Sequence, residues 1–177
     1  RPLPARAWPR PGTGMVVACV AWAGIGAAVM FAGLPRQAWL LAGGVLAVVV
    51  VLDLFLLRAW RSPQVVRELP DTLAIGIERD VTLVLESGTQ SGHVKVFDLH
   101  PGGWEAHGLP QALQLAREAR TSIRYRLRPT ARGRFVFAGV QLLVRSPLRF
   151  WQQSRVIGEP QQVEVFPNFA PLTRLAL

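Results

Sequence analysis

The chain has 177 residues, of which 50% are hydrophobic and 18% are charged, and 20 Lys and Arg against 11 Asp and Glu give a formal net charge of +9. This composition argues against a disordered chain, which combines low hydrophobicity with high net charge. The single cysteine excludes an intramolecular disulfide.

Two apolar stretches open the chain, at residues 15–34 and 38–57. Each is about 20 residues long, which as a helix crosses the roughly 30 Å hydrocarbon core of a bilayer. Only residues 35–37 separate them, so the connection is too short for anything but an antiparallel arrangement. The sequence therefore predicts a two-helix transmembrane hairpin over residues 15–57.

Asp53 is the only charged residue inside these stretches. The insertion free energy of the surrounding Val, Leu and Phe residues exceeds the cost of one carboxylate, about 3 kcal/mol, so the second span still inserts. We expect Asp53 to reach the nearby interface or a neighbouring helix. An intramembrane proton or ion site is the less favoured interpretation.

Arginines flank the hairpin asymmetrically. Three precede the first span, three follow the second, and the connection holds one: Arg1, Arg6, Arg10; Arg58, Arg61, Arg67; and Arg36. The positive-inside rule then places residues 1–14 and everything after residue 57 in the cytoplasm. This predicts a multi-pass protein of the bacterial inner membrane.

Small residues recur along both spans, at Gly24, Ala28 and Ala32 and at Gly43 and Ala47. Such stripes let helices approach closely. We expect them to pack the hairpin on itself, with dimerisation as the alternative.

From Gln64 onward, apolar residues alternate with polar ones, as in strands with one buried face. Residues 64–168 are therefore predicted to form an all-β, immunoglobulin-like antiparallel sandwich. Within it, residues 111–120 read as strand and turn, and the change of parity at Gly139 predicts a bulge or corner. Residues 169–177 are expected to link to a further domain.

Arginines gather in the second half of this segment. Arg124, Arg126, Arg128 and Arg134 are predicted to lie on the solvent faces of neighbouring strands. The simplest interpretation is a solvated face that pairs in part with the acidic half of the domain. The alternative is an interaction face for an acidic protein or anionic lipid headgroups, and nucleic acid is not an expected partner.

Residues for catalysis are not apparent in the sequence. His93, His100 and His107 recur every seven residues, but the strands and turns around them point in different directions, so a metal site is not expected. No nucleophile motif or phosphate-binding glycine loop occurs. We expect no catalytic residue, no cofactor and no metal.

Several short motifs follow the hairpin: Arg132-Gly133, then Ser146-Pro147-Leu148, then Val165-Phe166-Pro167-Asn168. In this order and spacing the chain resembles the N-terminal half of the bacterial DUF-fifty-eight family of membrane-anchored proteins. The motif positions are Arg132, Gly133, Ser146, Pro147, Leu148 and Pro167. One departure is Arg149, where the family usually has glycine.

The resemblance implies partnership with a MoxR-type AAA+ ATPase and a von Willebrand factor A-like domain downstream or as a partner. The expected function is that of a non-enzymatic, membrane-anchored interaction module or scaffold, in envelope or complex assembly. The alternatives are an accessory subunit of a membrane-bound, transglutaminase-like enzyme and a lipid-sensing module.

Overall fold

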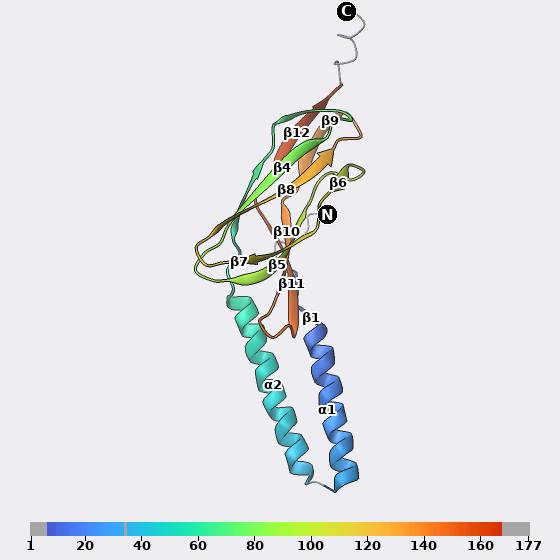
Figure 1. Cartoon of the computed structure of the whole chain (residues 1–177), viewed down its shortest axis with the longest axis vertical. Coiled ribbons are helices and arrows are strands. Elements are labelled where there is room, and N and C mark those ends of the chain that lie inside the picture. Colours follow the sequence, from blue (N-terminus) through green and yellow to red (C-terminus); the bar gives the residue numbers. More distant parts are fainter. Residues whose placement is uncertain (1–6, 34, 168–177) are drawn as a thin grey trace, which may run out of the picture. The chain divides into compact units, whose positions relative to one another are not determined.

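The computed structural model describes residues 7–33 and 35–167 (Figure 1). These residues form two compact units. One joins residues 7–61 to residues 143–154, and the other joins residues 62–142 to residues 155–167. Residues 143–154 thus belong with the helices, although the sequence suggested a sandwich running over residues 64–168. The expected linker at 169–177 lies outside the described residues.

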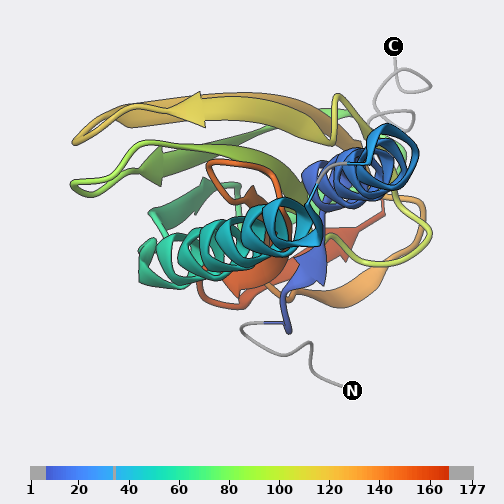
Figure 2. The ribbon, with the colours of Figure 1, turned by 90° about the horizontal axis from the view of Figure 1, so that it is seen from below.

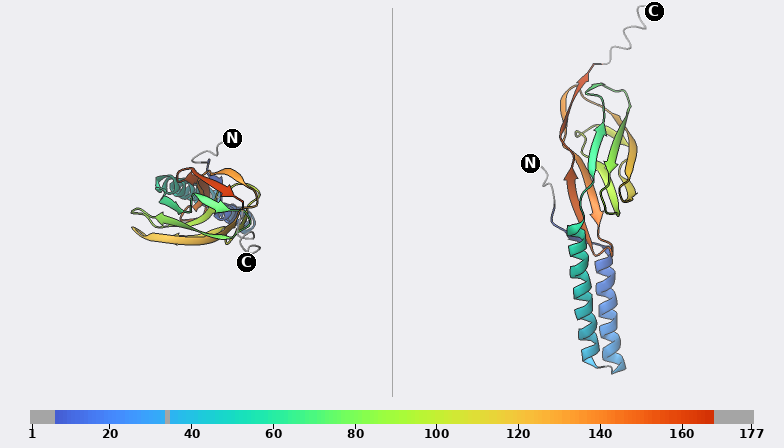
Figure 3. Two further views of the ribbon diagram at one scale, coloured as in Figure 1. Left: turned by 90° about the horizontal axis from the view of Figure 1, so that it is seen from above. Right: turned by 90° about the vertical axis from the view of Figure 1, so that its left-hand side faces the viewer.

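The first unit contains α1 (Thr13–Ala32) and α2 (Arg36–Ala59), which lie side by side (Figure 3). α1 ends at Gly33, whose left-handed φ of 67° lets its N–H reach the carbonyl of Val29. Arg36 and Gln37, expected in the connection, instead begin α2. Both helices are long and apolar enough to cross a membrane, as the sequence predicted.

Two tryptophans, one from each helix, pack α1 against α2. The rings of Trp22 and Trp39 stack with centroids 4.8 Å apart, and each indole N–H donates to the backbone carbonyl of the other tryptophan, at 3.5 and 3.3 Å. Each ring also fills a glycine notch: a Cβ on Gly26 would lie 2.8 Å from Trp39, and one on Gly43 would lie 2.9 Å from Trp22. Only glycine permits this close approach.

The expectation for the small-residue stripes is therefore half right. Gly43 packs the hairpin on itself, but a Cβ on Gly24 would meet nothing within 4 Å, and Ala28, Ala32 and Ala47 are exposed. The helix face that packs contains the tryptophans and Gly26, because a large ring needs a missing side chain opposite it.

The strands within the described residues are β1 (Arg10–Pro11), β2 (Gln64–Glu68), β3 (Thr72–Ala74), β4 (Arg79–Glu86), β5 (Gly92–Asp98), β6 (Glu105–His107), β7 (Gln111–Leu115), β8 (Arg120–Arg128), β9 (Gly133–Phe137), β10 (Val140–Arg145), β11 (Trp151–Ile157) and β12 (Gln161–Phe166). They form three sheets with the orders β2-β4-β8-β6, β3-β12-β9 and β1-β11-β10-β5-β7. β1 leads directly into α1 (Figure 2). The predicted strand at residues 111–120 is β7, followed by a turn into β8.

Strict alternation places the core of the second unit. In β8, Ile123, Tyr125 and Leu127 are buried, whereas the arginines between them are exposed. Opposite them, Val81 and Leu83 of β4 are also buried and pair in register with Tyr125 and Ile123. Period-two patterning therefore predicted the buried face of this sheet correctly.

Two features depart from a regular antiparallel sandwich. β12 pairs with β3 in parallel, so the expectation of purely antiparallel sheets is wrong for that pair. Gly139, with φ of 127°, stands between β9 and β10, which belong to different sheets. This change of sheet confirms the predicted corner. The position requires glycine, because a Cβ there would lie 2.9 Å from the carbonyl oxygen of Ile157.

Candidate functional site

Asp53 of α2 is fully buried, with none of its surface exposed. Its carboxylate accepts a hydrogen bond from Ser146 Oγ at 2.5 Å and from the backbone N–H groups of Leu148 and Phe150 at 3.0 and 3.3 Å. All three donors belong to the turn between β10 and β11. The expected contact with a neighbouring helix is therefore wrong: a turn about a hundred residues later in the chain supplies the donors to the carboxylate.

The local sequence explains why this turn presents its N–H groups. The N–H of Arg149 donates to the carbonyl of Ser146 at 3.0 Å, closing a four-residue turn with Pro147 in its second position, where a fixed φ is favourable. Ser146 Oγ also accepts the N–H of Trp151 at 3.0 Å. The motif Ser146-Pro147-Leu148 thus builds the turn and supplies two of the three donors to Asp53.

Trp151 makes a second contact with α2. Its indole N–H donates to the backbone carbonyl of Val50 at 3.0 Å, one helical turn before Asp53. We call the group of Asp53, Ser146, Leu148, Phe150 and Trp151 the clasp.

The same turn also contacts the start of α1. The N–H groups of Gly12 and Gly14 donate to the carbonyls of Phe150 and Arg149, at 2.7 and 3.1 Å. A Cβ at Gly12 would lie 2.4 Å from the carbonyl oxygen of Arg149. Glycine is required for this approach, so the turn is held by both helices at once.

Arg149 has a left-handed φ of 60°. Such a conformation favours glycine over residues with a Cβ. The departure seen in the sequence, arginine where the resembled family has glycine, therefore falls on a position at which the backbone itself favours glycine.

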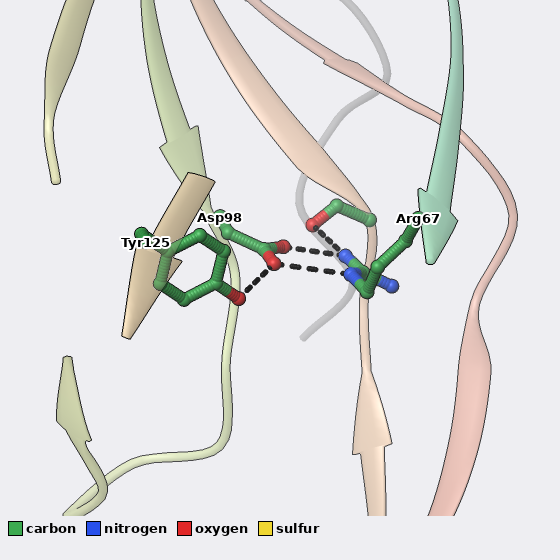
Figure 4. A network of polar contacts seen from close by, with 4 residues as sticks. Arg67, Asp98 and Tyr125 are labelled. Carbon is green, nitrogen blue, oxygen red and sulfur yellow. Dashed lines mark hydrogen bonds and ion pairs between the residues drawn. The ribbon is translucent and has the colours of Figure 1, made fainter. Parts of the chain in front are cut away.

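A second buried polar network lies in the other unit (Figure 4). Asp98 of β5 accepts the guanidinium of Arg67 in a two-pronged ion pair and the hydroxyl of Tyr125, and Arg67 also donates to the carbonyl of Gly139 at 3.1 Å. Arg67 and Tyr125 belong to one sheet and Asp98 to another. The network ties the two sheets together, and sequence analysis missed it because it counted Arg67 among the cations flanking the membrane.

The network changes the pKa of Tyr125. Burial, then the charge of Asp98 and the hydrogen bond to it, raises the pKa of Tyr125 well above its ordinary value of 10.0, against the opposing charge of Arg67. The side chains of Arg67 and Asp98 are only 5% and 0% exposed. A closed network of this kind is structural, because a substrate could not reach it.

The predicted arginine face does not form as expected. β8 pairs with β4 and β6, whereas β9 pairs with β12, so Arg134 lies on a different sheet from Arg124, Arg126 and Arg128. Three of the four arginines form ion pairs, each at least partly exposed: Arg126 with Glu78, Arg128 with Glu105, and Arg134 with Glu164. The hydrogen bond from Arg134 to Glu164 and the charge of Glu164 raise the pKa of Arg134 above its ordinary value.

The other motif residues lie in the sandwich unit. Gly133 begins β9 and pairs in register with Val165 of β12, so the Arg132-Gly133 segment and the segment leading to Pro167 are neighbours. His93 and His107 lie on β5 and β6 and His100 lies between these strands. Among the described residues, no group of three or more His, Cys, Asp or Glu side chains could hold a metal ion.

Comparisons with known proteins add little. No protein-family model matches the chain, and no curated protein matches it. Among solved structures, it is similar to the CARDB domain of a Pyrococcus furiosus protein in complex with di-metal ions, with 13% identity, a TM-score of 0.35, and coverage of 60% of this chain and 91% of that one. It is also similar to a non-cellulosomal cohesin from Archaeoglobus fulgidus, with 11% identity, a TM-score of 0.39, and coverage of 64% and 98%. At these scores neither likeness carries an argument about function.

Replacing Asp53 tests the clasp. Asp53→Ala leaves three donors without their acceptor, so we expect a loss of about 3 kcal/mol or more in the free energy of unfolding. Denaturant unfolding of the full chain in detergent, followed by tryptophan fluorescence, measures this. Leu52→Ala, at the neighbouring exposed position, is the control, and an equal loss in both variants would contradict the clasp.

Because the pKa of Tyr125 is raised in the folded chain, we expect the free energy of unfolding to fall at alkaline pH. The unfolded chain releases the Tyr125 proton near pH 10.0, whereas the folded chain retains it, so stability is unaffected below that pH and falls as the pH rises above it. Tyr125 is the only tyrosine, so tyrosinate absorbance reports it alone. Tyr125→Phe should remove this part of the alkaline loss, at a cost of about 1.5–3 kcal/mol near neutral pH; ordinary titration of Tyr125 in the folded chain would refute the assignment.

Proposed function

We propose that this chain is a membrane-anchored, non-enzymatic interaction module of the bacterial inner membrane, with its immunoglobulin-like sandwich on the cytoplasmic side. The clasp is the observation that carries the proposal. Asp53, fully buried in a long apolar run of α2, binds the β10–β11 turn to that helix, and Gly12 and Gly14 bind the same turn to the start of α1. Residues 143–154 are therefore bound to the hairpin within one unit, as a membrane anchor requires.

The outer faces of the hairpin support membrane insertion. At about 1.5 Å per residue, the 20 residues of α1 and the 24 of α2 reach about 30 and 36 Å, enough for the hydrocarbon core. Large apolar side chains are exposed along both helices: Val16, Val17, Val20, Ile25, Met30, Phe31, Leu40, Leu41, Val45, Val48, Val51, Leu52, Phe55 and Leu56. So large an apolar surface indicates contact with lipid or another apolar partner.

A MoxR-type AAA+ ATPase is the partner that we propose, on the basis of the resemblance in sequence. The Ser146-Pro147-Leu148 motif on which that resemblance partly rests has a definite physical role here, since it builds the turn that receives Asp53. A von Willebrand factor A-like domain would be presented by the same anchor. The face of β8 that carries Arg124 and Arg126 is the proposed docking surface.

Membrane topology is the first test. In a background without Cys19, Gln37→Cys should react with an impermeant thiol reagent applied to intact cells, because it lies at the hairpin connection. Ser91→Cys, exposed in the sandwich unit, should react only after the cells are opened. The reverse pattern would place the sandwich outside and exclude a cytoplasmic ATPase as its partner.

Docking through β8 is the second test. We expect Arg124→Glu with Arg126→Glu to lower ATPase retention on membranes that carry the full protein by about tenfold or more, because each reversal sets like charges against an acidic partner. Folding should survive, since exposed ion pairs contribute only about 0–1 kcal/mol. Arg79→Glu with Arg117→Glu, an equal charge change at exposed positions, is the control. Equal retention by both variants would contradict docking through β8 and would favour the interpretation of this face as a solvated surface.

A further inference from the structure

A cavity of about 210 Å³ lies beside the first turn of α1. Its walls include Thr13 and Val16 of the helix, together with Arg145, Arg149 and Trp151. We propose that this cavity binds the phosphate of an anionic lipid headgroup, a role that rests on the membrane insertion proposed above.

The two arginines are the chemical basis of the proposal. Arg145 and Arg149 are exposed, and within the described residues neither forms an ion pair with a carboxylate. Arg67, Arg120, Arg126, Arg128 and Arg134 each have an Asp or Glu partner. Other exposed arginines of the described residues, such as Arg79, Arg117 and Arg124, have none either, and what distinguishes Arg145 and Arg149 is the cavity that they share. Two arginines that line one cavity can offer planar guanidinium groups to a phosphate, which accepts paired N–H donors.

The phosphate would be bound by side chains, because the nearby backbone N–H groups at the start of α1 already have acceptors. The N–H groups of Gly12 and Gly14 already donate to carbonyls of the β10–β11 turn. Arg149 meanwhile holds a long cationic side chain on a left-handed backbone with φ of 60°, where glycine would be unstrained. A functional use of its guanidinium would account for keeping arginine at this position.

The apolar wall selects a lipid over a free anion. Val16 is 63% exposed and begins the run of exposed apolar residues on α1. The Trp151 ring is fixed by its hydrogen bond to Val50, and indoles of this kind gather at the boundary between headgroups and acyl chains. The cavity is smaller than the roughly 300–1,000 Å³ of sites for drug-sized ligands, so it fits a headgroup and not a whole metabolite.

Orientation agrees with this occupant. The cavity lies beside the first turn of α1, and under the positive-inside rule the flanking arginines predict the cytoplasmic leaflet for that end of the hairpin. Anionic lipids give this leaflet its negative surface potential, and each nearby arginine strengthens the attraction.

The experiment measures lipid preference directly. The full chain, purified in detergent, is titrated with phosphatidylglycerol or with phosphatidylcholine of the same acyl chains, and bound lipid is counted by native mass spectrometry. Wild type should prefer phosphatidylglycerol, and Arg145→Gln with Arg149→Gln should weaken that preference by about tenfold or more. Arg79→Gln with Arg117→Gln removes the same charge from exposed positions in the sandwich unit and should leave the preference unchanged.

Further arms separate the outcomes. Arg149→Gly, which relaxes the backbone and so keeps the turn, should weaken the preference as well. Competition by inorganic phosphate at the concentration of the lipid would identify a free-anion site and overturn the lipid assignment. Insertion is measured separately, by resistance of the membranes to alkaline extraction. If wild type resists extraction but the double glutamine variant keeps its preference, the lipid site is wrong and the anchor stands; if wild type is extracted, both proposals fail.

Discussion

A carboxylate in an apolar helix must be satisfied, and the way Asp53 is satisfied shapes the rest of the first unit. An unpaired buried charge costs several kcal/mol, so Asp53 requires donors that cannot move away. The β10–β11 turn supplies three, two of them backbone N–H groups whose direction the turn itself determines. Because Gly12 and Gly14 then admit the same turn against α1, one carboxylate sets where both helices meet the strands.

The hairpin is consequently held at two levels by different physics. At the clasp, directional hydrogen bonds to the Asp53 carboxylate fix the position of the turn against α2. Between Trp22 and Trp39, shape is added to the two indole hydrogen bonds, since each ring occupies the space of a missing side chain on the opposite helix. Apolar surfaces without polar contacts slide easily in lipid, where no hydrophobic force draws helices together. The reciprocal tryptophan–glycine packing and the clasp together define a single register for the hairpin.

Local pattern predicted what local physics controls. The apolar runs predicted both helices to within about two residues, and alternation predicted the inward face of β8, including Tyr125. The partners of Asp53 could not be predicted, because its donors include backbone amides of Leu148 and Phe150, which have no side-chain signature. The burial of Arg67 could not be predicted either, because nothing near it in the sequence indicates Asp98 as its partner. The separation of Arg134 from the β8 arginines has no local signal, because successive strands usually pair, whereas here the chain enters a different sheet after β8.

The distribution of partners says more about the arginines than their number does. A net charge of +9 suggests a general attraction to anions. On the sandwich, however, part of that charge is paired within the chain, with Glu78, Glu105 and Glu164 on the surface and with Asp98 in the core. Arg145 and Arg149 have no such carboxylate among the described residues, and they line one cavity beside the first turn of α1. An unanswered pair of guanidinium groups where exposed apolar helix begins differs physically from a self-paired sheet face, and only the former combines charge with an apolar wall. The same residue type therefore occurs in two settings in one chain, and the cavity shared by Arg145 and Arg149 distinguishes the second from the first.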